Sequence, residues 1–151
     1  MNSGINPENT AVWRKNEVDM PTTSFKGYNI VEFSFANKLP PGAQIQLENK
    51  YQFNVKYASN KTCVGEMSIR VADRSNAESF FVSLLLRGVF TFTPGTAKEE
   101  IHIETYKTLF PYARAYISTV TAGAGIPPII IPEVDIESQS IYRFDIKPKD
   151  S

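Results

Sequence analysis

Residues 80–92 constrain the fold most strongly, because this stretch is apolar on both faces of an extended chain. Its even positions include Phe80, Val82, Leu84, Leu86, Phe90 and Phe92, and its odd positions include Phe81, Leu85 and Val89. A strand of this kind needs cover on both sides. We expect one face to pack on the protein's own helices. The other meets a partner or a client, or else remains an exposed patch that invites association. Gly88 predicts a bulge or bend within this strand.

Three upstream segments show the alternation of a half-buried strand. Apolar and polar side chains alternate strictly in residues 51–57 and 66–71, and less strictly in residues 29–35. Period-two alternation is typical of a strand with one buried and one wet face. Residues 58–62 supply turn-forming side chains between two of these strands, and this connection is too short for a parallel crossover. The pattern therefore predicts an antiparallel sheet.

The chain after residue 97 changes to helical periodicity. Residues 98–109 predict a short helix or an irregular lead-in, and Pro111 fits the first turn of a new helix, where its missing N–H has no cost. One apolar stripe follows at helical spacing, made of Tyr112, Ala113, Tyr116, Ile117 and Val120. Gly123 is placed to end that helix. Residues 122–132, rich in glycine, proline and isoleucine, predict an apolar loop, and residues 133–146 are compatible with either a helix or a strand.

Composition and charge exclude several classes of function. A length of 151 residues favours one domain, and we expect residues 1–24 to form a loose N-terminal arm before a domain of residues 25–151. Sixteen basic side chains balance sixteen acidic ones, so we expect no nucleic-acid partner. No apolar stretch approaches the length of about 18 residues that spans a membrane, and residues 1–10 lack a signal-peptide core. The sequence therefore predicts a cytoplasmic protein that does not insert into membranes.

The sequence contains few candidate catalytic residues or motifs. Cys63 is the single cysteine and His102 the single histidine, so they form the only nucleophile–base pair of this type, without a third orienting group. One cysteine cannot form an internal disulfide or a cysteine-based zinc site. Gly123-Ala124-Gly125 lacks the later glycine and lysine of a phosphate-binding loop. We therefore expect no enzymatic activity, no metal and no cofactor.

Residues 109–114, Leu-Phe-Pro-Tyr-Ala-Arg, resemble the run that opens the main helix of the SecB family of protein-export chaperones. The run continues through residues 115–118 into a glycine-containing helix end and then an apolar segment with prolines, which is the order of that family. Residues 87–90 resemble the end of the family's fourth strand. The resemblance covers residues 28–135 in pattern and is specific around residues 84–92 and 109–132.

The resemblance implies an α+β fold, with a four-stranded antiparallel sheet and helices packed on one face. It also implies a homotetramer, built as a dimer of dimers, that holds unfolded polypeptides or preproteins in apolar grooves without ATP. In the family, these clients are delivered to the SecA motor of the export channel. The alternative is a structural or adaptor module that binds one fixed protein partner, for example a SecB-like chaperone associated with a toxin–antitoxin system.

The resemblance also assigns expected roles to particular residues. The candidates for the client groove are Tyr112, Tyr116, Phe90, Phe92, Ile126, Ile129, Ile130 and Ile131. The candidates for the contact between dimers are Phe80, Val82, Leu84 and Leu86. The family docks its motor through acidic side chains on the outer sheet face. Glu32 is the candidate for that role here, while Ser83 and Ala36 stand at two other positions of the acidic patch.

Overall fold

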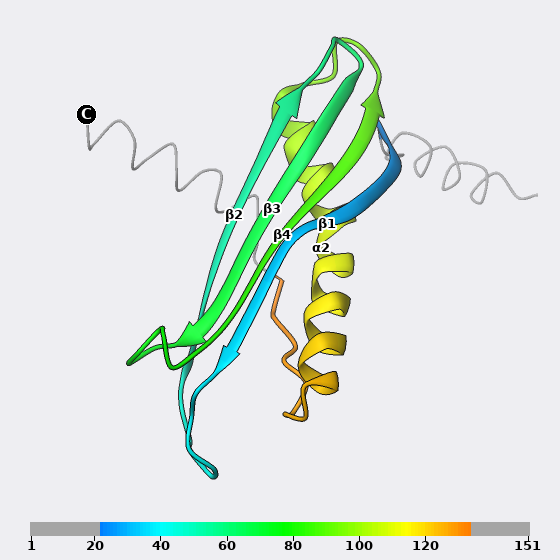
Figure 1. Cartoon of the computed structure of the whole chain (residues 1–151). Helices are drawn as coiled ribbons and strands as arrows, with labels where there is room; N and C mark the ends of the chain where they lie inside the picture. The colour runs from blue at the N-terminus through cyan, green and yellow to red at the C-terminus, as the bar shows by residue number, and fades with distance from the viewer. Residues whose placement is uncertain (1–21, 134–151) are drawn as a thin grey trace, which may run out of the picture.

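The computed structural model describes residues 22–133, which form one antiparallel sheet with one helix across one of its faces (Figure 1). The elements are β1 (Thr23–Asn37), β2 (Leu47–Tyr57), β3 (Thr62–Asp73), β4 (Phe80–Phe92) and α2 (Lys98–Gly123). The sheet order is β1-β4-β3-β2, and every neighbouring pair is antiparallel. The predicted fold class is confirmed. Most of the predicted arm and residues 134–146 lie outside the described residues.

The connection between β1 and β2 crosses the end of the sheet, because these two strands form its opposite edges. Both ends of this connection are tied to the β3–β4 turn. The Lys38 N–H donates to the Ser79 carbonyl at 2.7 Å, and the Arg74 N–H donates to the Gln46 carbonyl at 2.8 Å. Residues 38–46 therefore form a loop with fixed ends at the base of the sheet.

The start of β1 is tied to the helix by a carboxylate. The side chain of Glu104 accepts hydrogen bonds from the N–H groups of Thr22 and Thr23, each at 3.0 Å from Oε1. The Thr23 hydroxyl donates to the same oxygen at 2.8 Å. Thr23 and Ser24, which the sequence placed in the arm, are thus the first residues of β1.

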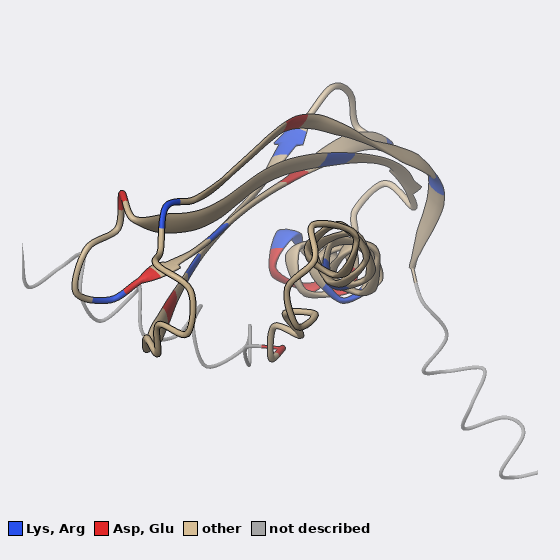
Figure 2. Cartoon of the chain, turned by 60° about the horizontal axis from the view of Figure 1, so that its bottom comes forward, with Lys and Arg blue, Asp and Glu red and all other residues tan. Residues whose placement is uncertain are grey.

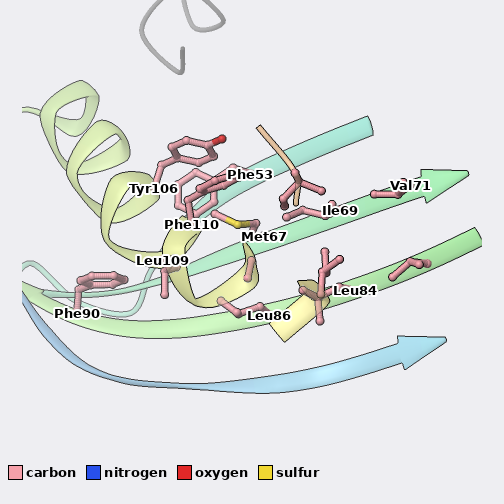
Figure 3. Close-up of a cluster of buried hydrophobic side chains, with 14 of the residues drawn as sticks. Phe53, Met67, Ile69, Val71, Leu84, Leu86, Phe90, Tyr106, Leu109 and Phe110 are labelled. Carbon is pink, nitrogen blue, oxygen red and sulfur yellow. The ribbon is translucent and has the colours of Figure 1, made fainter. Parts of the chain in front are cut away.

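The core lies between the sheet and α2, where alternate residues of adjacent strands point toward the helix (Figure 3). Three register pairs of β3 and β4 form its centre, namely Met67 with Leu86, Ile69 with Leu84, and Val71 with Val82. The helix contributes Ile101, Leu109, Phe110, Ala113 and Ile117, all at most 1% exposed. Burying such side chains contributes about 1.5–3 kcal/mol each. One face of the sheet is therefore occupied by the protein's own helix.

The inward face of β4 is the one expected at the contact between dimers, and this expectation is wrong. Phe80, Val82, Leu84 and Leu86 are 4%, 0%, 1% and 0% exposed within a single chain. They are covered because the even positions of β4 point toward α2. The odd positions, among them Phe81, Ser83 and Leu85, lie on the other face, where none of the described elements covers the sheet (Figure 2).

Gly88 does not form a bulge. It stands in register opposite Gly65 on one side and Tyr28 on the other, while the two register shifts of the sheet lie in β1, between Phe25 and Gly27 and between Ile30 and Glu32. A Cβ atom on Gly88 would lie 2.4 Å from Leu109 Cδ2. The glycine is therefore needed for the close approach of the helix to the sheet.

The helical region is one continuous helix of 26 residues, whereas the sequence predicted a break before Pro111. Proline lacks the N–H that would bond the carbonyl four residues earlier, so it normally interrupts a helix. Here the two flanking side chains that face the sheet, Phe110 and Ala113, are 1% and 0% exposed. Their burial holds both halves of the helix on the same core. Gly123 ends the helix as predicted. No helix within residues 22–133 is long and apolar enough to cross a membrane.

Candidate functional site

Two loops flank an open apolar cleft at the base of the sheet. One wall is the β1–β2 connection and the other is the segment that follows α2, and the cleft between them has a volume of about 880 Å³. It is lined by Asn37, Leu39, Pro40, Pro41, Gly42, Ala43, Gln44, Ile45, Leu47, Phe80, Gly125, Ile126, Pro127 and Ile129. None of these side chains is charged, and most are apolar. We call this feature the apolar cleft.

The wall after α2 is fixed at both ends by hydrogen bonds. The buried Thr121 hydroxyl donates to the Ile117 carbonyl at 2.7 Å and accepts from the Ile129 N–H at 2.9 Å. Further along, Ile131 is 1% exposed, and the Tyr51 hydroxyl donates to the Pro132 carbonyl at 2.8 Å. The segment therefore runs from the helix end back to β2 on the helix side of the sheet (Figure 1).

The isoleucines of this segment have different environments. Ile126 and Ile129 are half-buried and line the apolar cleft, so these two predicted client-groove residues lie at one site. Ile130 is 72% exposed and does not line the cleft. Ile131 is packed in the core, and Phe90 at 0% exposure is packed there too. The prediction for Ile131 and Phe90 is wrong, because both side chains are already covered by the sheet and helix.

Tyr112 and Tyr116 lie along the junction of α2 with β1. The Tyr112 ring packs on Tyr28 with centroids 4.6 Å apart and on Phe25 at 5.4 Å. The Tyr116 ring stands edge-on to Phe33 at 5.2 Å. Tyr28 and Tyr112 remain 43% and 39% exposed. We call these five residues the aromatic patch. The patch therefore leaves aromatic surface of Tyr28 and Tyr112 open to solvent.

Phe92, the remaining groove candidate, lies near the opposite end of the sheet. Its ring is half-buried and packs edge-on to Tyr57 at 5.7 Å. It lines neither the apolar cleft nor the aromatic patch. The structure therefore places Phe92 outside both of these surfaces.

Sequence reasoning missed the loop that forms the second wall of the cleft. Sequence reasoning assigned no role to residues 39–42, although Leu39 and Ile45 flank the prolines in the same way as the isoleucines of residues 126–131. Tyr28 was also missed, because it lies just before the alternating segment at residues 29–35 and next to the register shift at Gly27. Apolar side chains next to proline or glycine were the available signal in both places.

The outer sheet face carries both signs of charge, because Glu32, Glu66 and Arg87 share the face of Leu85 in the register. Glu32 stands opposite Leu85 in the register, so it faces away from α2 as a docking residue would require. The Glu66 carboxylate, on the same face, pairs with Arg87 at 2.6 Å and with Lys56 at 3.2 Å. These hydrogen bonds, that of Arg87 first, lower the pKa of Glu66. The acidic side chains here are interleaved with basic ones and do not form one acidic surface.

Cys63 and His102 pack against different aromatic side chains. Cys63 is 0% exposed and stands in register with Tyr57 and Phe90, and burial raises the pKa of its thiol. The His102 ring packs edge-on to Phe53 at 5.1 Å. A buried thiol with a raised pKa is a poor nucleophile. In the part of the chain that the structure describes, no group of three His, Cys, Asp or Glu side chains is arranged to hold a metal.

Comparison with known proteins finds SecB proteins among the relatives of this chain. The SecB family model, described as preprotein translocase subunit SecB, matches residues 21–147. The protein-export protein SecB of Caulobacter vibrioides is 31% identical over 115 residues, which cover 69% of this chain and 70% of that protein. The protein-export protein SecB of Rhodospirillum centenum is 29% identical over 155 residues, covering 95% of this chain and 90% of that protein.

A solved structure has the same fold. It is a SecB-like chaperone of Mycobacterium tuberculosis in complex with a ChAD peptide from the HigA1 antitoxin, with a TM-score of 0.60 and 13% sequence identity. The match covers 88% of this chain and 100% of that chain. The family model spans most of the sequence, and the sheet order and helix agree with the fold expected from residues 109–114. The chain belongs to the SecB family.

Proposed function

We propose that this chain is a cytoplasmic chaperone of the SecB type, which holds unfolded polypeptides or preproteins by binding and catalyses no reaction. The observation that carries the proposal is the apolar cleft, which is open, uncharged and about 880 Å³ in volume. Unfolded chains expose apolar side chains, and burying one of them contributes about 1.5–3 kcal/mol. Because hydrophobic burial is non-directional, one cleft accepts many sequences. No ATP or cofactor is needed for such binding.

The walls of the cleft suit repeated binding of different clients. Pro40, Pro41 and Pro127 restrict the backbone of both loops, so little conformational entropy is lost when a client binds. The aromatic patch offers further apolar surface along β1 and α2. Family membership and the peptide bound to the mycobacterial relative support a polypeptide as the ligand.

The test is suppression of aggregation. A chemically denatured model protein is diluted into buffer with and without the purified chain, in the absence of ATP, and light scattering is followed. We expect the wild type to suppress scattering and Ile126→Asp to weaken suppression, because a carboxylate in the apolar cleft must be desolvated when a client binds. Val89→Asp is the matched control, since Val89 is 41% exposed and does not line the cleft.

The alternative, an adaptor for one folded partner, gives a different result. An adaptor would bind that partner saturably and would leave the aggregation of unrelated denatured proteins unchanged. Wild-type chain that fails to reduce scattering at a several-fold molar excess would defeat the holdase proposal. Equal suppression by wild type and Ile126→Asp would instead place the client elsewhere on the surface.

Docking to the SecA motor is the second part of the proposal. Glu32 is the candidate residue, because it lies on the uncovered outer face of the sheet. We expect Glu32→Lys to weaken co-purification with SecA and to leave aggregation suppression intact. Unchanged co-purification would remove Glu32 from this role.

A further inference from the structure

A second hollow lies on the outer face of the sheet, where Arg87 and Val89 point away from α2. Its volume is about 390 Å³, and it is lined by Gly27, Tyr28, Asn29, Val64, Arg87 and Val89. None of these residues lines the apolar cleft. We call this feature the outer pocket.

The outer pocket exists because one row of paired residues across the sheet ends in a glycine. Val64, Val89 and Gly27 are paired across β3, β4 and β1. Gly27 has a φ of +143°, which side chains disfavour, and a Cβ atom there would have no neighbour within 4 Å. The row therefore lacks a third side chain, and Val89 stays 41% exposed.

Arg87 is the only charged residue that lines the outer pocket. Its Nε–H donates to the Glu66 carboxylate at 2.6 Å, which holds the guanidinium in place. Within residues 22–133, its two terminal nitrogens make no hydrogen bond. The exposed Asn29 stands opposite Arg87 in the register and adds an amide. A guanidinium with free terminal donors is suited to a carboxylate.

The charges beside the outer pocket leave a positive excess. The Glu66 carboxylate is shared between Arg87 and Lys56, whose ammonium group lies 3.2 Å away, so two cations meet one anion. The side chains of Arg87 and Lys56 are 47% and 68% exposed, and both are therefore accessible to an anion. Glu32, the acidic residue of β1, is paired with Leu85 and does not line the outer pocket.

Apolar surface continues beyond the outer pocket. Val89 and the half-buried Leu85 lie on the same face of β4, and Val64 flanks Val89 on β3. Val31, at the second register shift of β1, is 40% exposed. A small free anion bound at Arg87 would leave these side chains in water, whereas a polypeptide segment would cover them. The surface therefore favours a polypeptide that carries a carboxylate beside an apolar side chain.

We propose that the outer pocket docks a partner protein through an acidic segment, in which an Asp or Glu binds Arg87 and an adjacent apolar side chain covers Val89. This inference goes beyond the proposed holdase function, because it uses a surface separate from the apolar cleft. It also differs from docking through Glu32, since an acidic side chain attracts a basic partner and Arg87 attracts an acidic one.

The first experiment compares two labelled synthetic peptides. In one, Asp and Glu flank a central Leu-Val pair, and in the other Lys replaces every acidic residue. Fluorescence anisotropy measures the binding of each peptide to the full-length chain. We expect the acidic peptide to bind about tenfold or more tightly than the basic one, and added salt to weaken its binding because the contact is between exposed charges.

The second experiment removes the guanidinium. Arg87→Gln deletes the charge and retains a side-chain amide. Arg70→Gln is the matched control, because Arg70 lies on the same face, is ion-paired with Glu78 at 3.8 Å and does not line the outer pocket. We expect Arg87→Gln to weaken binding of the acidic peptide about tenfold and Arg70→Gln to leave it close to wild type. Circular dichroism and the urea midpoint verify that both variants are folded.

The third experiment separates the outer pocket from the cleft. Val89→Asp should lose the acidic peptide, because a carboxylate beside Arg87 repels it, and should keep aggregation suppression. Ile126→Asp should keep the acidic peptide and weaken suppression. A wild-type chain that binds the acidic peptide but does not suppress aggregation would refute the holdase and leave this inference standing.

Several outcomes would overturn the inference itself. They include no binding of the acidic peptide to the wild type, equal binding of the two peptides, and equal losses in Arg87→Gln and Arg70→Gln. Loss of binding in Ile126→Asp but not in Val89→Asp would show that the peptide is a client of the cleft. If Val89→Asp reduces the size of the assembly in light scattering, the outer pocket meets a second copy of the chain and not an acidic partner.

Discussion

Gly88 controls the distance between the sheet and the helix through the absence of one methyl group. A Cβ atom there would lie 2.4 Å from Leu109 Cδ2 and 3.2 Å from its Cγ. Leu109 is 0% exposed, so it has little freedom to move away. We expect Gly88→Ala to lower the free energy of unfolding by about 1–3 kcal/mol, the usual cost of overpacking a core. The midpoint of urea denaturation measures this change.

Gly123 provides the control for that substitution. It ends α2, and a Cβ atom there would have no neighbour within 4 Å. Gly123→Ala should therefore leave the urea midpoint nearly unchanged. If the clash with Leu109 is the cause, Leu109→Ala in the Gly88→Ala background should cost less than Leu109→Ala alone. Additive costs would show that Gly88 acts through the backbone.

The carboxylate of Asp73 makes the stability of the fold depend on pH. It lies at the β3–β4 turn, to which residues 38–46 are tied. Its carboxylate accepts the Ser79 hydroxyl at 2.8 Å and the Ser75 N–H at 3.0 Å. These bonds, that of Ser79 first, lower the pKa of Asp73 in the folded chain. A lowered folded pKa contributes stability above the ordinary aspartate value of about 3.9, and this contribution is lost as pH falls through the folded pKa.

We expect the urea midpoint of the wild type to decrease as the pH is lowered below about 4. Asp73→Asn should be less stable at neutral pH and should lose less stability over that acidic range, because its side chain does not titrate. Parallel pH curves for the two proteins would assign the acid sensitivity to other carboxylates, such as the ion-paired Glu66.

At the scale of elements, α2 continues through a residue that normally interrupts a helix. Pro111 leaves the Lys107 carbonyl without its helical donor, and its ring is exposed rather than packed in the core. We expect Pro111→Ala to raise the free energy of unfolding by about 1 kcal/mol or more, because it restores that donor. The urea midpoint should rise accordingly. A lower midpoint would show that the local geometry imposed by proline is needed for Phe110 and Ala113 to reach the core together.

At the scale of the whole molecule, β4 provides a test of which face is internal and which is available for assembly. Leu84 is 1% exposed beneath α2, whereas its neighbour Leu85 lies half-buried on the outer face. We expect Leu84→Asp to unfold the chain, since an unpaired buried charge costs several kcal/mol against a typical total of about 5–15 kcal/mol. Leu85→Asp should keep the wild-type circular dichroism spectrum.

The homotetramer, a dimer of dimers, remains a prediction, and light scattering on the wild type tests it. Phe80, Val82, Leu84 and Leu86 cannot form its contacts while α2 covers them. If Leu85→Asp splits the assembly and retains the fold, the outer face of β4 contributes to a contact. A folded Leu84→Asp variant of smaller size would contradict the assignment of faces made here.

Local patterns in the sequence were sufficient for the sheet strands in outline and for the end of the helix. Residues 80–92 were predicted as a strand with the bounds that β4 has, and the turn at residues 58–62 joined β2 to β3 as an antiparallel hairpin. Gly123 marked the helix end, and the run at residues 109–114 pointed to the correct family. These features depend on periodicity, turn-forming residues and short motifs, which are carried by neighbours in the chain.

The tertiary structure alone decided which surfaces meet. Both faces of β4 are apolar in sequence, so only the position of α2 identifies the even residues as core and removes them from an assembly contact. The cleft joins residues 37–47 to residues 125–129, and the crossing of the β1–β2 connection places β1 and β2 at opposite edges of the sheet. Pro111 stays within a helix because packing outweighs its local preference. Such outcomes depend on contacts between distant parts of the chain, which local periodicity does not encode.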